Sequence, residues 1–251
     1  MKTIIITQAR MSSTRLPGKV IKEIAGKTLL AYHLESLKKV EGVDEVYVAT
    51  TNEEGIGPVL EISKGLGIKY FQGSVDDVLE RFYRISEIEK PDTIIRVTSD
   101  CPLIDASLIS SGLRTFNELN IDYLTNTLNP TYPDGMDFEI FKASALYKSW
   151  EQAKKKSERE HVTPYIWKNS SFHGGSLFSS YSFENKKNYS GVRLTVDVID
   201  DYELVKKLII ECGEAKSWKT YVDFLENNSD LLDINKNNKR NEGYDKSLKN
   251  D

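Results

Sequence analysis

Short β-branched segments alternate with amphipathic segments over the first 120 residues. The β-branched segments are residues 3–8, 43–50, 68–71 and 93–98. The amphipathic segments, with apolar side chains at helical spacing, are residues 29–40, 59–66, 75–88 and 108–119. Short apolar strands that alternate with helices are typical of a mostly parallel sheet with helices on both faces. The alternation therefore predicts the α/β class.

The order is less regular after residue 120. Segments with strand character are residues 122–125, 138–141, 177–181 and 193–196, and segments with helical spacing are residues 143–156, 161–167, 202–212 and 218–227. No linker rich in Pro, Gly or Ser divides the chain, so we expect one domain over residues 1–228, with halves at 1–120 and 121–228. Residues 229–251 are rich in Asn and Lys. They form either a frayed polar tail or an ordered extension.

The charge and the cysteine content exclude several classes of protein. The 251 residues include 34 Lys and Arg against 38 Asp and Glu, a net charge of −4, which argues against a nucleic-acid partner. No apolar run approaches the roughly 20 residues of a membrane helix, and the apolar N-terminal run is too short for a signal peptide. Two cysteines do not make a disulfide framework. We therefore expect a cytoplasmic protein with no membrane partner.

The loop after the first expected strand is basic and contains small residues. It reads Q-A-R-M-S-S-T-R-L-P-G-K over residues 8–19. The first five charged residues of the chain are all cationic: Lys2, Arg10, Arg15, Lys19 and Lys22. Ligands of open α/β sheets bind beyond the carboxyl ends of strands, and such a loop offers amides, hydroxyls and cations to a polyphosphate. The loop is neither a Walker loop nor G-x-G-x-x-G, and a solvated basic loop is the alternative.

The residue order of this loop resembles the signature of the cytidylyltransferases that make CMP-activated sugar acids, such as the CMP-Kdo and CMP-sialic acid synthetases. It is most similar to the SpsF type of spore coat polysaccharide biosynthesis, and the resemblance continues through residues 96–104, 158–165 and 194–197. Ser12, Ser99 and the lack of a proline after Asp197 depart from the pattern. The resemblance implies a single three-layer α/β/α, Rossmann-like domain of the nucleotide-diphospho-sugar transferase (GT-A-like) type, with a mixed, mostly parallel sheet.

Two carboxylates follow expected strands at the ligand edge of the sheet. Asp100 follows residues 93–98, and Asp197 follows residues 193–196. Two carboxylates that face a triphosphate suit Mg²⁺, which takes one or two carboxylates together with phosphates and waters. The resemblance assigns both residues to the metal. The alternative is helix capping, to which we assign Asp105.

The resemblance also implies the residues that bind CTP. The expected catalytic residues are Arg10, Arg15, Lys19, Asp100 and Asp197. The expected nucleotide-binding residues are Ala9, Arg10, Ser12, Ser13, Thr14, Lys19, Thr50, Asn52, Gly73, Ser74, Asp77 and Arg81. Related enzymes read cytosine at the turn that holds Gly73 and Ser74, and we expect Arg81 to pair with Asp77 one helical turn back. Capping of the following helix by Ser74 and Asp77 is the alternative role of this turn.

The acceptor pocket is expected in the second half of the chain. Its candidate residues are Asp134, Asp137, Glu139, Arg159, Glu160, His161 and Tyr165. The acids could bind hydroxyls or an amine, Arg159 could bind a carboxylate or phosphate, and His161 could act as a base. A solvated loop followed by a helix turn is the alternative. His33 lies in an apolar helix and is expected in the core, as is Cys101 beside Asp100.

These expectations combine into one hypothesis. The chain would be a Mg²⁺-dependent cytidylyltransferase that transfers CMP from CTP to a sugar acid or related small acceptor and releases pyrophosphate, in surface polysaccharide or glycoconjugate biosynthesis. The resemblance implies a homodimer. The alternatives are a glycosyltransferase on the same fold and a non-catalytic nucleotide-binding protein. The sequence Asp100-Cys101-Pro102 contains no D-x-D motif, which disfavours the glycosyltransferase.

Overall fold

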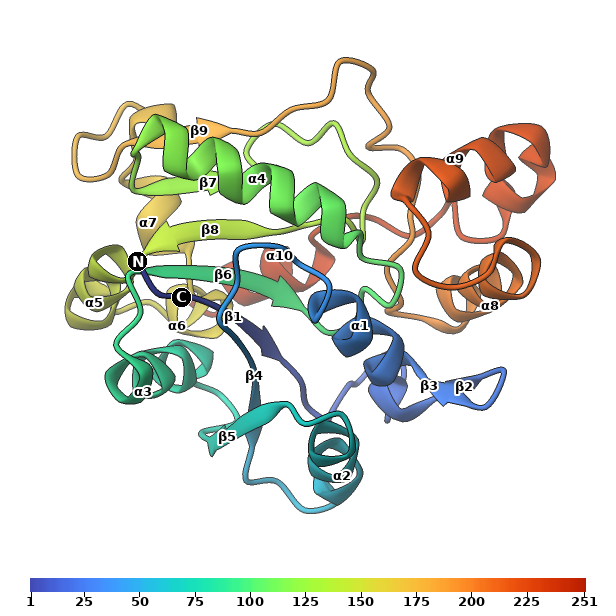
Figure 1. The fold of residues 1–251 in the computed structure, drawn as a ribbon, viewed down its shortest axis with the longest axis horizontal. Helices are drawn as coiled ribbons and strands as arrows, with labels where there is room; N and C mark the ends of the chain where they lie inside the picture. Colours follow the sequence, from blue (N-terminus) through green and yellow to red (C-terminus); the bar gives the residue numbers. More distant parts are fainter.

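A seven-stranded mixed sheet forms the centre of the molecule (Figure 1). The computed structural model describes residues 1–251. The strand order is β5-β4-β1-β6-β8-β7-β9. The strands are β1 (Thr3–Gln8), β4 (Glu45–Thr51), β5 (Lys69–Gly73), β6 (Thr93–Thr98), β7 (Tyr123–Thr125), β8 (Glu139–Lys142) and β9 (Ser180–Ser182). Only β8 runs antiparallel to its neighbours, so the mixed, mostly parallel sheet is confirmed.

Helices cover both faces of the sheet. The helices are α1 (Leu29–Leu37), α2 (Gly57–Gly65), α3 (Val78–Glu89), α4 (Ala106–Leu119), α5 (Ala143–Gln152), α6 (Lys156–His161), α7 (Pro164–Lys168), α8 (Ile199–Cys212), α9 (Trp218–Asn227) and α10 (Glu242–Leu248). Short 3₁₀ turns lie at Lys19–Ile21, Ser171–His173 and Ser229–Asp233, and Glu23–Ile24 pairs with Lys27–Thr28 as a small hairpin, β2 and β3.

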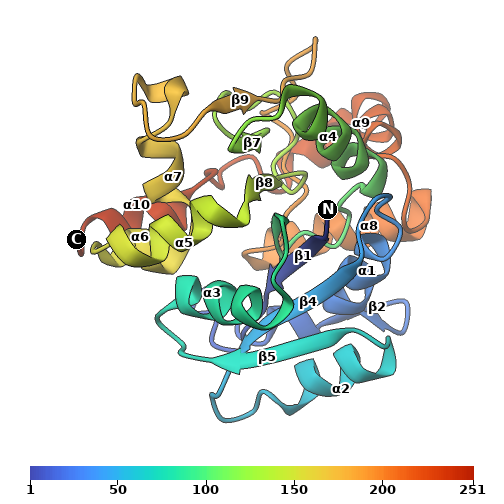
Figure 2. The same ribbon diagram turned by 60° about the vertical axis from the view of Figure 1, so that its left-hand side comes forward.

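The alternation of apolar residues along the central strands explains the two covered faces. Ile5 and Ile95 pack against apolar side chains of α1, α4, α8 and α9. Ile4, Ile6 and Ile94 point to the opposite face, where α3 and α5 contribute the apolar side chains. Successive side chains of a strand point to opposite faces, so both sides of β1 and β6 are buried. Figure 2 shows α3, α5 and α6 on one side and α1, α4 and α8 on the other. The three-layer architecture is therefore confirmed.

One expected strand is wrong. Residues 193–196 form no strand of the sheet, and they hold only an isolated bridge between Asp134 and Arg193. Leu194 and Val196 bury their side chains completely, which gives the segment its strand-like sequence. Its backbone amides, however, donate to two different loops: Leu194 N–H to Asp134 O at 2.7 Å, and Val196 N–H to Asp100 O at 2.8 Å. The segment therefore fixes two loops relative to each other instead of extending the sheet.

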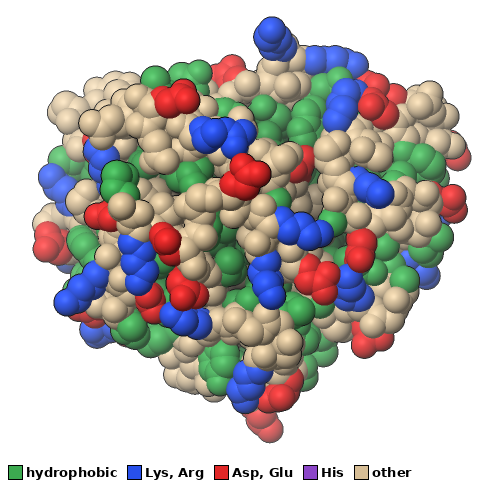
Figure 3. All heavy atoms as spheres, in the orientation of Figure 1, with side chains coloured by type: hydrophobic (Ala, Val, Ile, Leu, Met, Phe, Trp, Pro, Cys, Tyr) green, Lys and Arg blue, Asp and Glu red, His purple; other side chains and the backbone are tan.

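The expected helix over residues 143–156 is also divided. Ala153 has extended backbone angles (φ −68°, ψ 118°), so α5 ends before it and α6 begins after it. Residues 229–251 fold back onto the domain, where Asn235 is buried and α10 packs beside α6 (Figure 2). None of the helices combines the length and the apolar character that crossing a bilayer requires. On the face shown in Figure 3, acidic and basic side chains are interspersed, as expected for a net charge of −4.

Candidate active site

The Lys19 ammonium joins the two carboxylates that the sequence singled out. Its Nζ lies 2.9 Å from Asp100 Oδ2 and 2.8 Å from Asp197 Oδ1. Lys19 opens a 3₁₀ turn directly after Gly18, whose positive φ of 63° turns the loop. Asp100 lies two residues beyond β6, and Asp197 follows the segment that is tied to Asp100 O. Asp100 and Asp197 lie 81 and 178 positions from Lys19 in the sequence, and all three residues meet at the carboxyl edge of the sheet.

The charges of this group are stabilised by one another. Burial raises the pKa of Asp100, but the Lys19 ammonium and the Thr98 hydroxyl outweigh burial, and the net pKa lies well below its usual range. Burial lowers the pKa of Lys19, and the two carboxylates more than offset it, so the pKa is raised. Asp100 and Lys19 are therefore both charged at neutral pH. The site presents two carboxylates around one cation.

Arg15 extends this group toward the solvent. Its Nη2 lies 2.9 Å from Asp197 Oδ1, and its Nη1 lies 2.8 Å from Glu242 Oε2 of α10. Arg10 is exposed at the same loop and forms no ion pair. Glu53, which the sequence did not indicate, accepts a hydrogen bond from Met11 N–H at 2.7 Å and holds the loop in shape. Ser12 and Thr14 are exposed and Ser13 half-buried along the loop, where a ligand could reach them.

The expected nucleotide turn lies at the neighbouring strand ends. Thr50 is buried and donates from its hydroxyl to Ala9 O at 2.9 Å, while the exposed Asn52 donates from its backbone N–H to Gly73 O at 3.2 Å. Three adjacent strands, β1, β4 and β5, therefore bring Ala9, Asn52 and Gly73 to one edge. A Cβ on Gly73 would lie 2.8 Å from the Arg81 side chain, so this position needs glycine.

The expected pair of Arg81 with Asp77 is wrong. Arg81 is buried beneath Gly73 and donates from Nη1 to Ala49 O at 2.8 Å. Burial, followed by the nearby Arg10 charge, lowers its pKa to about 10. Asp77 instead caps α3 by accepting from Glu80 N–H, and Ser74 Oγ accepts from Asp77 N–H at 3.3 Å. These two hydrogen bonds confirm the capping role of Ser74 and Asp77.

Asp77 pairs across the site with a residue of the second half. Arg159 Nη2 lies 2.5 Å from Asp77 Oδ2, and its guanidinium lies 4.5 Å from the centre of the Trp150 ring. This pair connects the turn before α3 to α6. Arg159 thus sits between the expected nucleotide and acceptor sides.

Three of the four expected acceptor acids each face an arginine. Asp134 lies 2.5 Å from Arg193 Nη1, Asp137 pairs with Arg240, and Glu139 pairs with Arg96. Glu139 also accepts from the Tyr123 hydroxyl at 2.6 Å and from Thr163. Asp134 and Glu139 are buried, so the solvated-loop alternative is wrong for them. Burial raises the pKa of Asp137 to about 7, because Arg240 offsets burial and the neighbouring Asp134 only in part.

The remaining acceptor candidates lie on α6 and α7. Burial, and then the Arg96 charge, lower the pKa of His161 to about 4, so its imidazole is neutral at pH 7. Its Nε2 lies 3.0 Å from Ser247 Oγ, which also donates to Glu160 at 2.7 Å. Tyr165 is half-buried and its ring lies at an angle to Phe178. His33 is fully buried between Thr7 Oγ1 and Cys101 O, as expected of a core residue.

Arg193 is a site residue that the sequence analysis missed. It bonds to Asp134, to Asp197 (3.0 Å) and twice to Asp201 (2.8 and 3.0 Å), and its side chain is only 7% exposed. Arg193 directly precedes residues 194–197, which resemble the cytidylyltransferases, and this position could have indicated it. Glu53 and Arg240 carried no such signal, because their partners lie 42 and 103 residues away.

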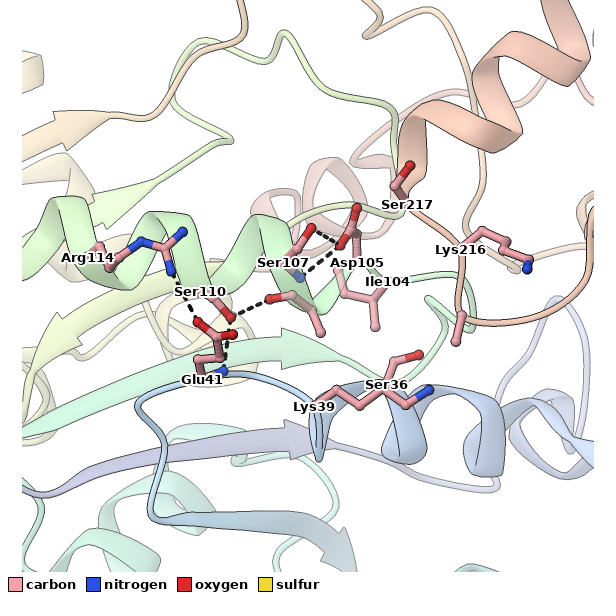
Figure 4. A pocket seen from close by; sticks show the side chains of 12 residues that line it. Ser36, Lys39, Glu41, Ile104, Asp105, Ser107, Ser110, Arg114, Lys216 and Ser217 are labelled. Atoms are coloured by element: carbon pink, nitrogen blue, oxygen red, sulfur yellow. Dashed lines mark hydrogen bonds and ion pairs between the residues drawn. The ribbon is translucent and has the colours of Figure 1, made fainter.

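A polar cavity of about 410 Å³ lies apart from these residues (Figure 4). It is lined from α1, α4 and the loop before α9, and Asp105 and Glu41 form hydrogen bonds within it. Asp105 Oδ1 accepts from Ser107 N–H at 2.8 Å, which confirms that Asp105 caps α4. None of the expected site residues lines this cavity.

The chain matches known proteins over most of its length. The family model of the cytidylyltransferases matches residues 4–235. The spore coat polysaccharide biosynthesis protein SpsF of Bacillus subtilis is 32% identical over 216 residues, covering 84% of this chain and 88% of the relative. A cytidylyltransferase structure from Leptospira borgpetersenii has a TM-score of 0.85 and 34% identity, covering 92% of this chain and 97% of that one.

A more distant structure shares the fold. The structure of CMP:2-keto-3-deoxy-manno-octonic acid synthetase complexed with CTP has a TM-score of 0.64 and 19% identity, covering 84% of this chain and 99% of that one. At 19% identity, this likeness concerns the fold alone. From the match over residues 4–235, the chain belongs to the cytidylyltransferase family and is a nucleotidyltransferase.

Proposed function

We propose that this enzyme transfers CMP from CTP to a sugar acid or a related small acceptor, with Mg²⁺ and with release of pyrophosphate. The observation that carries the proposal is the meeting of Asp100, Asp197 and Lys19 beside Arg15 at the carboxyl edge of the sheet. The names of SpsF and of the CMP-Kdo synthetase support a sugar-acid acceptor and a role in surface polysaccharide or glycoconjugate biosynthesis. We also propose that the enzyme is a homodimer, as its resemblance to the cytidylyltransferases implies.

The donor set suits magnesium. Asp100 and Asp197 both direct a carboxylate oxygen at the Lys19 ammonium, so the two carboxylates are close enough to bind one small cation together. No group of three or more His, Cys, Asp or Glu side chains forms a metal cage, as zinc would require. Magnesium takes one or two carboxylates and completes its shell with phosphates and water. Asp100 and Asp197 would hold it, and it would neutralise charge on the α-phosphate when bound.

The side chains of the first loop would position the triphosphate. Lys19 and Arg15 are the cations nearest to the carboxylate pair, and Arg10 is free of ion pairs at the same loop. In the reaction an acceptor hydroxyl oxygen forms a bond to the α-phosphorus, and the bond from that phosphorus to the bridging oxygen of the β-phosphate breaks. Positioning and fixed charge supply most of the rate in such a displacement. Asp137, whose pKa is about 7, could take the hydroxyl proton at neutral pH.

A screen of acceptors tests the proposal. The enzyme is mixed with CTP, MgCl₂ and single acceptors, among them 3-deoxy-manno-octulosonate and N-acetylneuraminate, and pyrophosphate release is measured. We expect release that needs CTP, the divalent ion and the acceptor together, and a larger thermal stabilisation by CTP than by ATP, GTP or UTP. Equal stabilisation by all four nucleotides, or turnover unaffected by EDTA, would contradict the proposal.

A further inference from the structure

Residues 236–251 lie beyond the part of the chain that the family model matches, and they fold over the acceptor side of the candidate site. In Figure 2, α10 lies beside α6, which carries Glu160 and His161. Glu242 pairs with Arg15, and Ser247 bonds to Glu160 and His161. This C-terminal segment therefore contacts both the expected triphosphate side and the expected acceptor side.

Arg240 of this segment has a buried donor that no acceptor satisfies. Its side chain is 15% exposed, its Nη2 contacts Asp137 Oδ1, and its Nη1 makes only a long bond of 3.3 Å to Tyr132 O. Its Nε is buried and has no hydrogen-bond partner. A buried, unpaired N–H of a charged group is costly, and most such groups in folded proteins find a partner. The free donor therefore indicates a missing anionic or polar partner.

The other arginines that hold acceptor-side acids are satisfied. Arg193 bonds through Nε, Nη1 and Nη2 to the carboxylates of Asp134, Asp197 and Asp201. Arg96 bonds through Nε to Gln8 and through Nη1 to Glu139. Burial raises the pKa of Asp137, the acid that Arg240 faces, to about 7. Of these three arginines on the acceptor side, Arg240 is thus the one with an unpaired hydrogen-bond donor.

We propose that Arg240 is a specificity-determining residue that binds the carboxylate of the acceptor. A guanidinium forms strong, charge-assisted hydrogen bonds to a carboxylate, and the unpaired Nε of Arg240 is the donor available for one. The acceptor class is a small sugar carrying a carboxylate next to its reacting carbon. The inference deepens the proposed function and depends on it.

Paired substrates test the role of Arg240. Pyrophosphate release is measured at saturating CTP with 3-deoxy-manno-octulosonate and N-acetylneuraminate, and with the methyl ester of each. The variants are Arg240→Gln, Arg240→Lys and the control Lys239→Gln, which removes one exposed cation from the adjacent position. Arg240→Gln should lower kcat/KM for the acid by about 30- to 150-fold, the scale of a lost hydrogen bond to a charged group. The kcat/KM for the ester and the KM for CTP should stay unchanged.

The outcomes separate the inference from the proposed function. Arg240→Lys should retain part of the preference for acid over ester, and Lys239→Gln should retain all of it. A purely structural role of Arg240 would lower acid and ester use equally, which would overturn the inference. Acid use by Arg240→Gln at the wild-type rate would overturn it also. If the wild-type enzyme uses CTP but no carboxylate acceptor, the sugar-acid proposal and the inference both fail.

Discussion

At the scale of single residues, the site depends on a cation placed between two anions. Lys19 is only 14% exposed, and it bonds to carboxylates from two separate segments. Two carboxylates this close repel each other unless a cation lies between them. In the chain alone that cation is Lys19. A triphosphate offers Lys19 other anionic oxygens, so substrate binding and the charge balance of the site are coupled.

Lys19→Ala and Arg15→Ala test the triphosphate contacts. Each change should lower kcat/KM for CTP by about 30- to 150-fold, since each removes a charge-assisted hydrogen bond worth about 2–3 kcal/mol. Binding of CMP, which lacks the outer phosphates, should hardly change. Lys22→Ala is the matched control, because Lys22 contacts the Tyr202 ring and no carboxylate. An equal loss of CMP and CTP affinity would place the loop at the nucleoside end instead.

Asp100 and Asp105 lie five residues apart and should respond in opposite ways. Asp100→Asn keeps the shape but removes an anionic ligand, so turnover should fall by at least about 10²-fold in a chain that still folds. Asp105→Ala removes the cap of α4 and the acceptor of Trp218 N–H, so it should lower the free energy of unfolding by about 1–2 kcal/mol and spare turnover at 25 °C. An active Asp100→Asn enzyme that still responds to magnesium would exclude Asp100 as a ligand.

At the scale of elements, periodicity predicted what is local and missed what is distant. The strand over residues 93–98 and the helix over residues 218–227 have the predicted bounds, because strand alternation and helical spacing are local properties. Residues 193–196 have the same apolar alternation as a strand, yet their backbone bonds to Asp134 and Asp100. No local pattern specifies those partners. For the same reason the sequence missed Arg193 and Arg240, since Arg193 lies 59 residues from Asp134 and Arg240 lies 103 residues from Asp137.

The contact between the loop of Asp134 and the segment of Arg193 depends on Gly135. Its φ is 102°, and a Cβ there would lie 2.6 Å from Thr195 N and 2.7 Å from Leu194 C. Both atoms belong to the backbone, so neither can move aside cheaply. Gly135→Ala should therefore lower the free energy of unfolding by about 1–3 kcal/mol, measured by urea denaturation. It should also raise the acceptor KM more than the CTP KM, because Asp134 and Asp137 flank this position.

Gly191→Ala is the control for this substitution. A Cβ at Gly191 would meet no atom within 4 Å, and its φ is not positive. The change should leave stability equal or slightly higher, since alanine restricts the unfolded chain. A Gly135→Ala protein as stable as Gly191→Ala would show that the loop does not need this close approach.

At the scale of the whole molecule, three distant parts of the chain complete the site. The loop after β1 supplies Lys19, the end of β6 supplies Asp100, and the segment before α8 supplies Asp197. Residues 229–251 then connect to two of these parts, through Asn235 with Asp201 and Glu242 with Arg15, and to the loop before β8 through Arg240 with Asp137. Unfolding of any one part should therefore destabilise the others. The free energy of unfolding of the whole protein then reports on changes in the site.

The dependence of stability on pH should include a measurable contribution from His161. Burial, then Arg96, lower its pKa to about 4, and the charges of Glu160 and Glu139 offset this only in part. Between pH 4 and 6.5 the unfolded chain takes up a proton at this residue and the folded protein does not, so the free energy of unfolding falls as the pH is lowered through that window. His33 acts in the same direction, with a pKa of about 4, whereas the raised pKa of Asp137 acts in the opposite one.

A difference measurement isolates the contribution of His161. Urea unfolding of His161→Gln and of the wild type is compared at pH 7.5 and at pH 4.5, so that His33, Asp137 and the other titrating groups cancel. From pH 7.5 to pH 4.5, the free energy of unfolding should fall by about 2 kcal/mol more for the wild type than for His161→Gln, since one pH unit of pKa separation is worth about 1.36 kcal/mol. His173→Gln, a change at an exposed histidine, should shift little with pH. A difference between His161→Gln and wild type that stays constant from pH 7.5 to 4.5 would show that His161 titrates alike in the folded and unfolded chains, and that the C-terminal segment does not bury it.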